Sequence, residues 1–228
     1  MPFPLHPVHR TLAPTIVLAL AIGGVLMSPN TQAQSATTQI DLSGMKPGMA
    51  PDDFVFSRTG SGAVGEWRVT DDPTASNRRV IAQTSTDKTD YRFPLAVYQR
   101  VSAKNVDMKV QFKPVAGKVD QAGGIVVRLT SPDDYYVVRA NALEDNVRFY
   151  RVVKGSRQQI QGANLKVAPN QWHTLGLRAE GDRFTVSFDG KPLFTAQDKT
   201  FANPGKVALW TKADSVTHFD MIAITPLD

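Results

Sequence analysis

The feature that most constrains the fold is a strict alternation of apolar and polar residues over positions 106–113. This segment reads VDMKVQFK, with an apolar residue at every second position. Because successive side chains of a strand point to opposite faces, the pattern predicts a strand with one buried face, as in antiparallel sheets. The same spacing in two later segments extends the set of residues that we expect to be buried: Val106, Met108, Val110, Phe112, Leu175, Leu177, Phe184, Val186 and Phe188.

Further strand signals follow along the chain, and no segment after residue 34 has the apolar spacing of an amphipathic helix. Residues 123–129 are apolar at most positions, which predicts a central strand. Residues 184–188 alternate again and run into Asp189-Gly190, a dipeptide that favours a tight hairpin turn. The 15 prolines and 16 glycines punctuate the chain at short intervals. About a dozen short strands separated by turns predict an all-β, two-sheet antiparallel sandwich.

Residues 1–33 differ in character from the rest of the chain. A basic start with His and Arg at positions 6, 9 and 10 precedes an apolar run over residues 15–27, and small and polar residues follow up to Ala33. This order predicts an export signal peptide cut after Ala33, and hence a soluble periplasmic or extracellular protein. A retained membrane anchor is the alternative, but the apolar run is short beside the roughly 20 residues of a span.

The composition of the remaining chain limits the class of protein. Removal of residues 1–33 leaves 25 basic and 21 acidic residues, a net charge of +4, because Arg10 is the only Lys or Arg in the leader. No run of Lys and Arg occurs, which argues against a nucleic-acid surface. The chain has no cysteine, so an exported domain must rely on a packed core rather than on disulfides. We expect a flexible lead-in over residues 34–51 and one domain over 52–228.

Several segments carry a resemblance to known domains. The segment NQWHTLGLRAEGDRFTVSFDGKPLF (170–194) resembles the W-H-x-L-x-L and G-D-x-F-x-V-x-x-D-G-K pattern of laminin-G-like domains with the concanavalin A-like jelly-roll fold. The segments GGIVVR (123–128), YYVVRAN (135–141), GKVALWTKADS (205–215) and FDMIAI (219–224) resemble the exported bacterial branch of that group. That branch is related to family 16 glycoside-hydrolase-like and 3-keto-disaccharide-hydrolase-like domains.

The catalytic pattern of the related hydrolases does not carry over to this chain. Family 16 hydrolases use two glutamates of an E-x-D-x-E or E-x-D-x-x-E strand as nucleophile and acid/base. Here Glu66, Glu144 and Glu180 are the only glutamates, and none belongs to such a motif. Glu144 and Asp145 are adjacent, so on a strand they would point to opposite faces, and beside Asn146 they indicate a turn. Catalytic residues therefore remain unassigned.

The hairpin predicted over residues 135–151 carries more polar and aromatic side chains than a core hairpin needs. Its alternation places Tyr136, Val138 and Ala140 between the sheets and leaves Arg139 on the opposite face. In the resembling fold one sheet is concave and bears the ligand site. Side chains that hydrogen-bond hydroxyls and flat rings that stack on sugars suit a carbohydrate. We expect the ligand-binding residues to be Arg128, Arg139, Asn141, Arg148, Tyr150, Trp210, Lys212 and Asp214.

Structural roles compete with this interpretation. The arginines can form a salt-bridged ladder with Asp133, Asp134 or Asp145, and Trp210 can belong to the core. We expect core positions for Trp67 and Trp172 and structural roles for His173 and His218. No zinc-site spacing is present. No cofactor is expected, although calcium remains a minor alternative because the resembling domains often bind it. Its candidate ligands are Asp52, Asp53, Asp120 and Asp220.

The leading functional prediction is a carbohydrate-binding-type module that holds a glycan on a concave sheet face. A glycoside-active enzyme and a protein-interaction domain of the cell envelope are the alternatives. A groove with an acid and a base would favour the enzyme, and a flat, filled face would favour the interaction domain. We expect no nucleic-acid partner and no membrane span after removal of the signal.

Overall fold

The computed structural model describes residues 1–5 and 36–227, which form 15 strands without a helix. The predicted signal peptide and its cleavage after Ala33 fall almost wholly outside the described residues. Within the described residues, no helix has the length and apolar character that crossing a membrane requires. The strands are β1 (Thr38–Gln39), β2 (Phe54–Gly60), β3 (Trp67–Asp71), β4 (Arg79–Gln83), β5 (Arg92–Ala103), β6 (Asn105–Ala116), β7 (Ala122–Ser131), β8 (Asp134–Asn141), β9 (Asn146–Val153), β10 (Ser156–Asn164), β11 (His173–Glu180), β12 (Arg183–Phe188), β13 (Lys191–Gln197), β14 (Gly205–Trp210) and β15 (Val216–Leu227).

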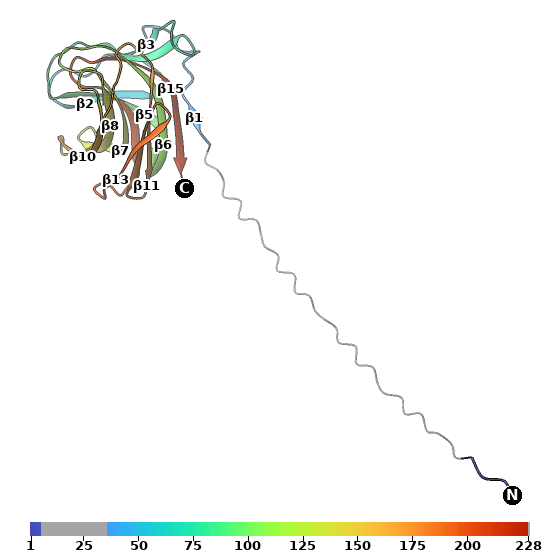
Figure 1. Ribbon diagram of the computed structural model, residues 1–228. Helices are drawn as coiled ribbons and strands as arrows, with labels where there is room; N and C mark the ends of the chain where they lie inside the picture. Colours follow the sequence, from blue (N-terminus) through green and yellow to red (C-terminus); the bar gives the residue numbers. More distant parts are fainter. Residues whose placement is uncertain (6–35, 228) are drawn as a thin grey trace. The chain divides into compact units, whose positions relative to one another are not determined.

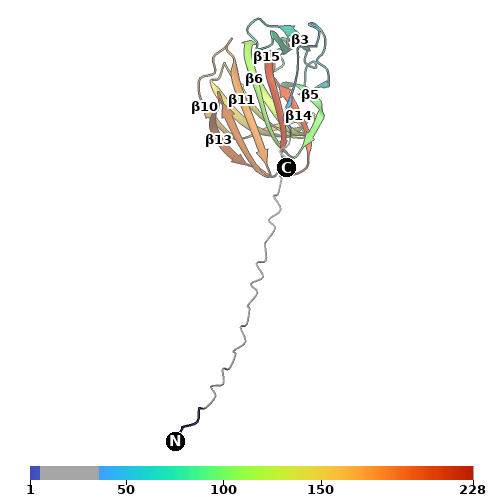
Figure 2. The ribbon, with the colours of Figure 1, turned by 90° about the vertical axis from the view of Figure 1, so that its right-hand side faces the viewer.

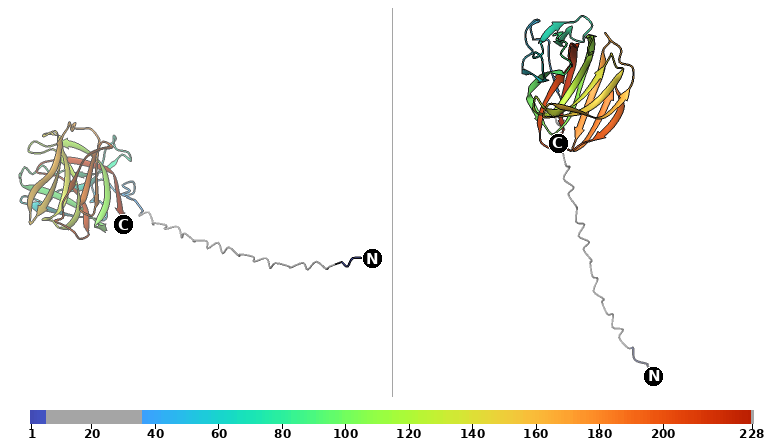
Figure 3. Two further views of the ribbon diagram at one scale, coloured as in Figure 1. Left: turned by 60° about the horizontal axis from the view of Figure 1, so that its bottom comes forward. Right: turned by 90° about the vertical axis from the view of Figure 1, so that its left-hand side faces the viewer.

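The strands form two antiparallel sheets that pack face to face (Figures 1 and 2). The eight-stranded sheet has the order β13-β12-β11-β6-β15-β4-β3, with β1 paired to β15. The seven-stranded sheet has the order β10-β9-β8-β7-β14-β5-β2. Figure 3 shows the sandwich from two further directions. The predicted all-β jelly-roll sandwich is confirmed.

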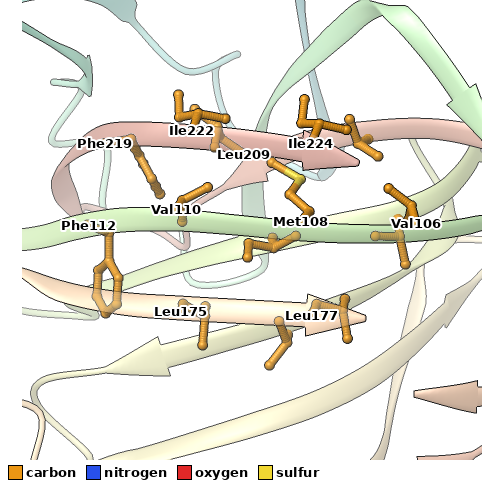
Figure 4. Close-up of a cluster of buried hydrophobic side chains, with 14 of the residues drawn as sticks. Val106, Met108, Val110, Phe112, Leu175, Leu177, Leu209, Phe219, Ile222 and Ile224 are labelled. Carbon is orange, nitrogen blue, oxygen red and sulfur yellow. The ribbon is translucent and has the colours of Figure 1, made fainter. Parts of the chain in front are cut away.

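The core between the sheets is built by the alternating residues that the sequence singles out. In the eight-stranded sheet Val110 of β6 lies opposite Leu175 of β11, and Met108 lies between Leu177 and Ile224 (Figure 4). All nine residues predicted to be buried are buried, with exposures of 5% or less. Period-2 spacing therefore identified the correct face of β6, β11 and β12.

The segment expected to be a flexible lead-in differs from that expectation. Thr38 of β1 pairs with Ile224 of β15. Leu42 is buried, and Ile40 and Met45 pack against the core. These apolar residues are isolated in a polar segment, so they give no periodic signal in the sequence. The folded domain therefore includes this segment and begins before Asp52.

Two predicted turns are confirmed. Asp189 and Gly190 join β12 to β13 with φ values of 48° and 75°, the two positive values that a tight type I′ turn needs. Glu144 and Asp145 lie between β8 and β9, and Asp145 has a φ of 49°. The acidic pair at 144–145 is therefore held at the end of the β8–β9 hairpin.

Candidate functional site on the outer face of the seven-stranded sheet

The β8–β9 hairpin turns its polar side chains away from the core, as its alternation predicts. Tyr136, Val138 and Phe149 belong to the core between the sheets. Arg139 of β8 and Arg148 of β9 are directly paired, so their side chains leave from the same face of the sheet. We call this side, which points away from the eight-stranded sheet, the outer face. Its buried apolar residues are Phe93, Leu95, Val97, Ala122, Val126, Leu129, Tyr135, Val137, Tyr150, Val152, Ala208 and Trp210.

Strong curvature of the seven-stranded sheet encloses part of the outer face. The hydroxyls of Thr59 in β2 and Tyr135 in β8 lie 2.7 Å apart, although β7, β14 and β5 separate these strands in the sheet. In a flat sheet the two strands would be about 19 Å apart. Tyr91 donates a 2.9 Å hydrogen bond to Gly155 O and accepts one of 3.1 Å from the Arg157 N–H. Opposite corners of the sheet therefore meet across a concave outer face.

Aromatic rings and arginine side chains alternate along this face. Phe93 and Trp210 stack with their ring centroids 5.4 Å apart. The Arg157 guanidinium lies 4.9 Å from the centre of the Phe93 ring and 4.4 Å from that of Tyr150. The Arg139 guanidinium lies 5.8 Å from the Tyr150 ring. Such cation–π contacts hold the flat guanidinium groups in fixed orientations against the rings.

A glycine makes this arrangement possible. Gly124 of β7 lies between Arg139 and Trp210 in the sheet. A Cβ atom there would meet the Arg139 Cβ at 3.2 Å, the Trp210 ring at 3.3 Å and the Val138 carbonyl oxygen at 2.7 Å. The absence of a side chain at position 124 therefore leaves the space that the large Trp210 side chain needs.

Arg139 is the centre of the first polar network. It forms a 2.7 Å ion pair with Glu144 and donates hydrogen bonds to Asn146 and, at 3.2 Å, to the Tyr150 hydroxyl. Asn146 also donates to Glu144 at 3.1 Å. Burial alone would raise the pKa of Glu144, but Arg139 and Asn146 outweigh it and hold that pKa below its ordinary value. Glu144 is therefore ionised near neutral pH and, with its side chain 46% exposed, can accept further hydrogen bonds.

Lys212 is the centre of a second network beside the first. Its ammonium group lies 2.8 Å from Asp90 and 2.9 Å from Asp120. Asn141 donates a 2.8 Å hydrogen bond to the other carboxylate oxygen of Asp120. Burial raises the pKa of Asp120, against the opposing effects of Lys212 and Arg139. Burial lowers the pKa of Lys212, but the two carboxylates outweigh it and the net shift is upward, so the ammonium remains charged.

Five of the eight predicted ligand residues gather in these networks and on their aromatic base. Arg139, Asn141, Tyr150 and Lys212 are members, and Trp210 lies fully buried beneath the outer face. Arg148 leaves from the same face but extends across Gly162 toward the sheet edge, where it donates a 2.6 Å hydrogen bond to Asn164. It is therefore at the border of the cluster.

Arg128 lies elsewhere. The register of β7 shifts between Val127 and Ser131, and Arg128 has a φ of 53°. This bulge turns its side chain to the inner side, over the rings of Tyr136 and Phe184. There it donates to three backbone carbonyls, of Lys104 at 2.7 Å, Phe201 at 2.8 Å and Gly181 at 2.5 Å. Through these hydrogen bonds Arg128 connects three loops at one border of the core.

Asp214 acts on the site through the backbone. Its carboxylate accepts hydrogen bonds from the N–H groups of Lys118, Val119 and Asp120 at 2.9 to 3.0 Å. Burial would raise the pKa of Asp214, but these three donors outweigh it and lower that pKa. The carboxylate therefore fixes the loop that presents Asp120 to Lys212.

Six residues of the cluster are not among the predicted ligand residues: Asp90, Phe93, Asp120, Glu144, Asn146 and Arg157. Asp90 and Glu144 lie in loops, where alternation gives no information about direction. Arg157 pairs with Val152 of β9, so the parity of β10 would have placed it on the outer face. The turn at Lys154-Gly155, where both residues have positive φ, was the available signal for that hairpin.

The residues considered for calcium are dispersed. Asp53 pairs with Arg100 at 2.7 Å, Asp120 with Lys212, and Asp220 accepts from the N–H groups of Ser76 and Met221 at 2.7 Å. Over residues 1–5 and 36–227, no three His, Cys, Asp or Glu side chains lie close enough together to hold a metal ion.

The eight-stranded sheet carries a separate polar cluster on its own outer side. Asp72 is buried and pairs with Lys113 and, at 2.8 Å, with His218. Trp172, expected in the core, instead lies part-exposed here, donates a 3.0 Å hydrogen bond to Thr74 and lies 5.0 Å from the Lys113 ammonium. The reason is alternation: the ring of the next residue, His173, lies on the core side against Phe112 and Phe188, so Trp172 points to the opposite side. Trp67 is in the core and His173 is held by Asp189 and Ala168 O, both as expected.

Fold and outer-face architecture define the class as a concanavalin A-like jelly-roll domain of the lectin and glucanase type. The chain belongs to the family described as galactocerebrosidase, C-terminal lectin domain, whose model matches residues 95–227. This range begins in β5 and includes β7, β8, β9 and β14, which carry most of the outer-face cluster. A search of curated proteins finds no significant match.

Solved structures agree on the fold. The carbohydrate-binding module CBM66 from Bacillus subtilis is 17% identical with a TM-score of 0.57, over 85% of this chain and 97% of that one. The β-glucanase of Bacillus licheniformis is 13% identical with a TM-score of 0.54, over 86% of this chain and 100% of that one. At these identities the likeness concerns the arrangement of strands.

Proposed function

We propose that this chain is an exported carbohydrate-binding module that holds a glycan on the outer face of its seven-stranded sheet. The observation that carries the proposal is the presence of two preorganised polar networks on one face, one around Arg139, which Tyr150 joins, and one around Lys212. Its charged groups are fixed by hydrogen bonds before any ligand arrives, which lowers the entropic cost of binding. The family to which the chain belongs and its similarity in fold to CBM66 agree with this function.

The chemistry of the networks matches a sugar. Exposed carboxylate oxygens of Glu144 and Asp90 can accept hydrogen bonds from hydroxyl groups, while Arg157 can donate them. Tyr91, which is 44% exposed, supplies aromatic surface for the apolar face of a pyranose ring. Export is supported by the basic start and apolar run within residues 1–33, and we propose a periplasmic or extracellular location on that basis.

Glu144→Gln is expected to weaken glycan binding about tenfold or more, since a charge-assisted hydrogen bond to a hydroxyl is lost while the side chain keeps its size. A glycan array with the domain lacking residues 1–33 identifies the ligand, and isothermal titration calorimetry then compares the variants. Because Glu144 neutralises the buried Arg139, Glu144→Gln is also expected to lower the melting temperature, and circular dichroism checks that the variant is folded at the temperature of the titration.

Glu180→Gln is a matched control on the other sheet. Glu180 forms a 2.7 Å ion pair with Arg178 and is 50% exposed, so it matches Glu144 in exposure and pairing, although its arginine partner is exposed rather than buried. Equal affinity of the wild type and Glu144→Gln, or equal losses in both variants, would contradict the proposed site. Binding to no glycan at all would contradict the proposed function.

A further inference from the structure

We infer that the glycan is acidic and that Arg157 receives its carboxylate or sulfate group. This inference rests on the proposed function and adds the class of ligand. Arg157 lies on the outer face against Phe93 and Tyr150, at the side of the cluster opposite Glu144. The residue is partly exposed, so an incoming group can approach its side chain.

Arg157 forms no ion pair within the described part of the chain, although Lys212 and, to a lesser extent, the charge of Arg157 lower the pKa of Asp90. Arg139 and Lys212 are each neutralised by carboxylates at 2.7 to 2.9 Å. Arg157 forms no such ion pair, and its Nη1 atom is buried without a hydrogen-bond acceptor. A buried donor on a charged group without a partner is destabilising, and cation–π contacts with two rings offset only part of that free energy.

The charged side chains of the cluster do not balance one another. Two cations, Arg139 and Lys212, are bound to three carboxylates, those of Asp90, Asp120 and Glu144. Arg148 and Arg157 add two further positive charges on the same face, and Arg148 is bonded to neutral acceptors. These seven groups therefore carry one positive charge in excess, and a single anionic substituent would balance it.

The orientation of the Arg157 guanidinium also suits an anionic group. The guanidinium of Arg157 is held flat against aromatic rings, and a planar fork of N–H donors fits the oxygens of a carboxylate or sulfate in a bidentate manner. Because the Arg157 N–H donates a 3.1 Å hydrogen bond to the Tyr91 hydroxyl, a sugar on the exposed Tyr91 ring brings its substituents within reach of Arg157. An acidic sugar therefore uses both groups at once.

The experiment measures binding of three polymers by isothermal titration calorimetry: galactan, a sulfated galactan and polygalacturonate. We expect at least one acidic polymer to bind about tenfold tighter than galactan, in line with one additional charge-assisted contact. The preference should fall as sodium chloride is raised from about 0.05 to 0.5 M, because salt screens a partly exposed charge pair. Comparison of the two acidic polymers separates carboxylate from sulfate recognition.

Arg157→Gln tests the assigned residue, and the ratio of acidic to neutral affinities should fall below about two. Arg183→Gln is the matched control, since Arg183 is exposed on β12 in the other sheet and the change in net charge is identical. Equal affinities for galactan and both acidic polymers would overturn the inference and leave the proposed function intact. A preference that survives in Arg157→Gln, or that is lost equally in Arg183→Gln, would overturn the role of Arg157.

Discussion

Replacement of Phe188 by alanine is expected to lower the free energy of unfolding by about 3 to 5 kcal/mol, the range for a buried phenylalanine. Phe188 ends β12 and is 5% exposed. Its ring stacks on His173 at 5.0 Å and lies 6.4 Å from the Phe112 ring. His173 belongs to β11 and Phe112 to β6, and each of these strands is paired with a neighbouring strand on both sides. They are therefore held in place and cannot move to fill the cavity left by the lost ring.

Urea denaturation followed by tryptophan fluorescence measures this loss. Val55→Ala is the control, since Val55 is 55% exposed and should change stability by less than about 0.5 kcal/mol. A loss under about 1 kcal/mol for Phe188→Ala, well below the buried-phenylalanine range, would show that its ring is not part of the core.

Arg128→Ala is expected to destabilise the domain by about 3 kcal/mol or more, because three backbone carbonyls lose a charged donor together. These carbonyls, of Lys104, Gly181 and Phe201, belong to three separate loops. The guanidinium also lies 5.1 Å from the Phe184 ring. Among the described residues no carboxylate forms an ion pair with Arg128, so the stabilisation depends mainly on the fork of N–H donors.

Arg128→Lys distinguishes the fork from the charge alone. A single ammonium group cannot span three carbonyls in different directions, so we expect this variant to recover less than half of the lost stability. Chemical denaturation measures both variants, with Arg183→Ala as an exposed control. Full recovery by lysine would contradict the bridging role, as would a loss of glycan affinity in an otherwise folded Arg128→Lys protein.

The fold was predictable because its signals are local. Period-2 spacing determined which side of β6, β11 and β12 is buried, and the same rule placed Arg139 and Arg148 together on one face. The turn at Asp189-Gly190 followed from the backbone preference of that dipeptide. These predictions need no knowledge of distant contacts, and the structure confirms them.

The candidate site was predictable only in part because it depends on features that alternation does not encode. A bulge moved Arg128 from the expected face to the core side. Asp90 and Glu144 come from loops whose paths are determined by tertiary contacts. Curvature of the sheet brings Tyr91 to Gly155 across the outer face, and neither segment carries a sequence pattern that predicts that contact.

The central claim is that a glycan binds on the outer face of the seven-stranded sheet, and the three tryptophan indoles report on this directly. Trp210 lies beneath that face, Trp67 lies in the core, and Trp172 lies on the outer side of the eight-stranded sheet. The measurement is a ¹H–¹⁵N correlation spectrum of the labelled domain during titration with the glycan selected on the array. The account predicts that the Trp210 indole resonance shifts with the binding curve while the Trp172 resonance stays in place. A titration that shifts Trp172 and leaves Trp210 unchanged would contradict it.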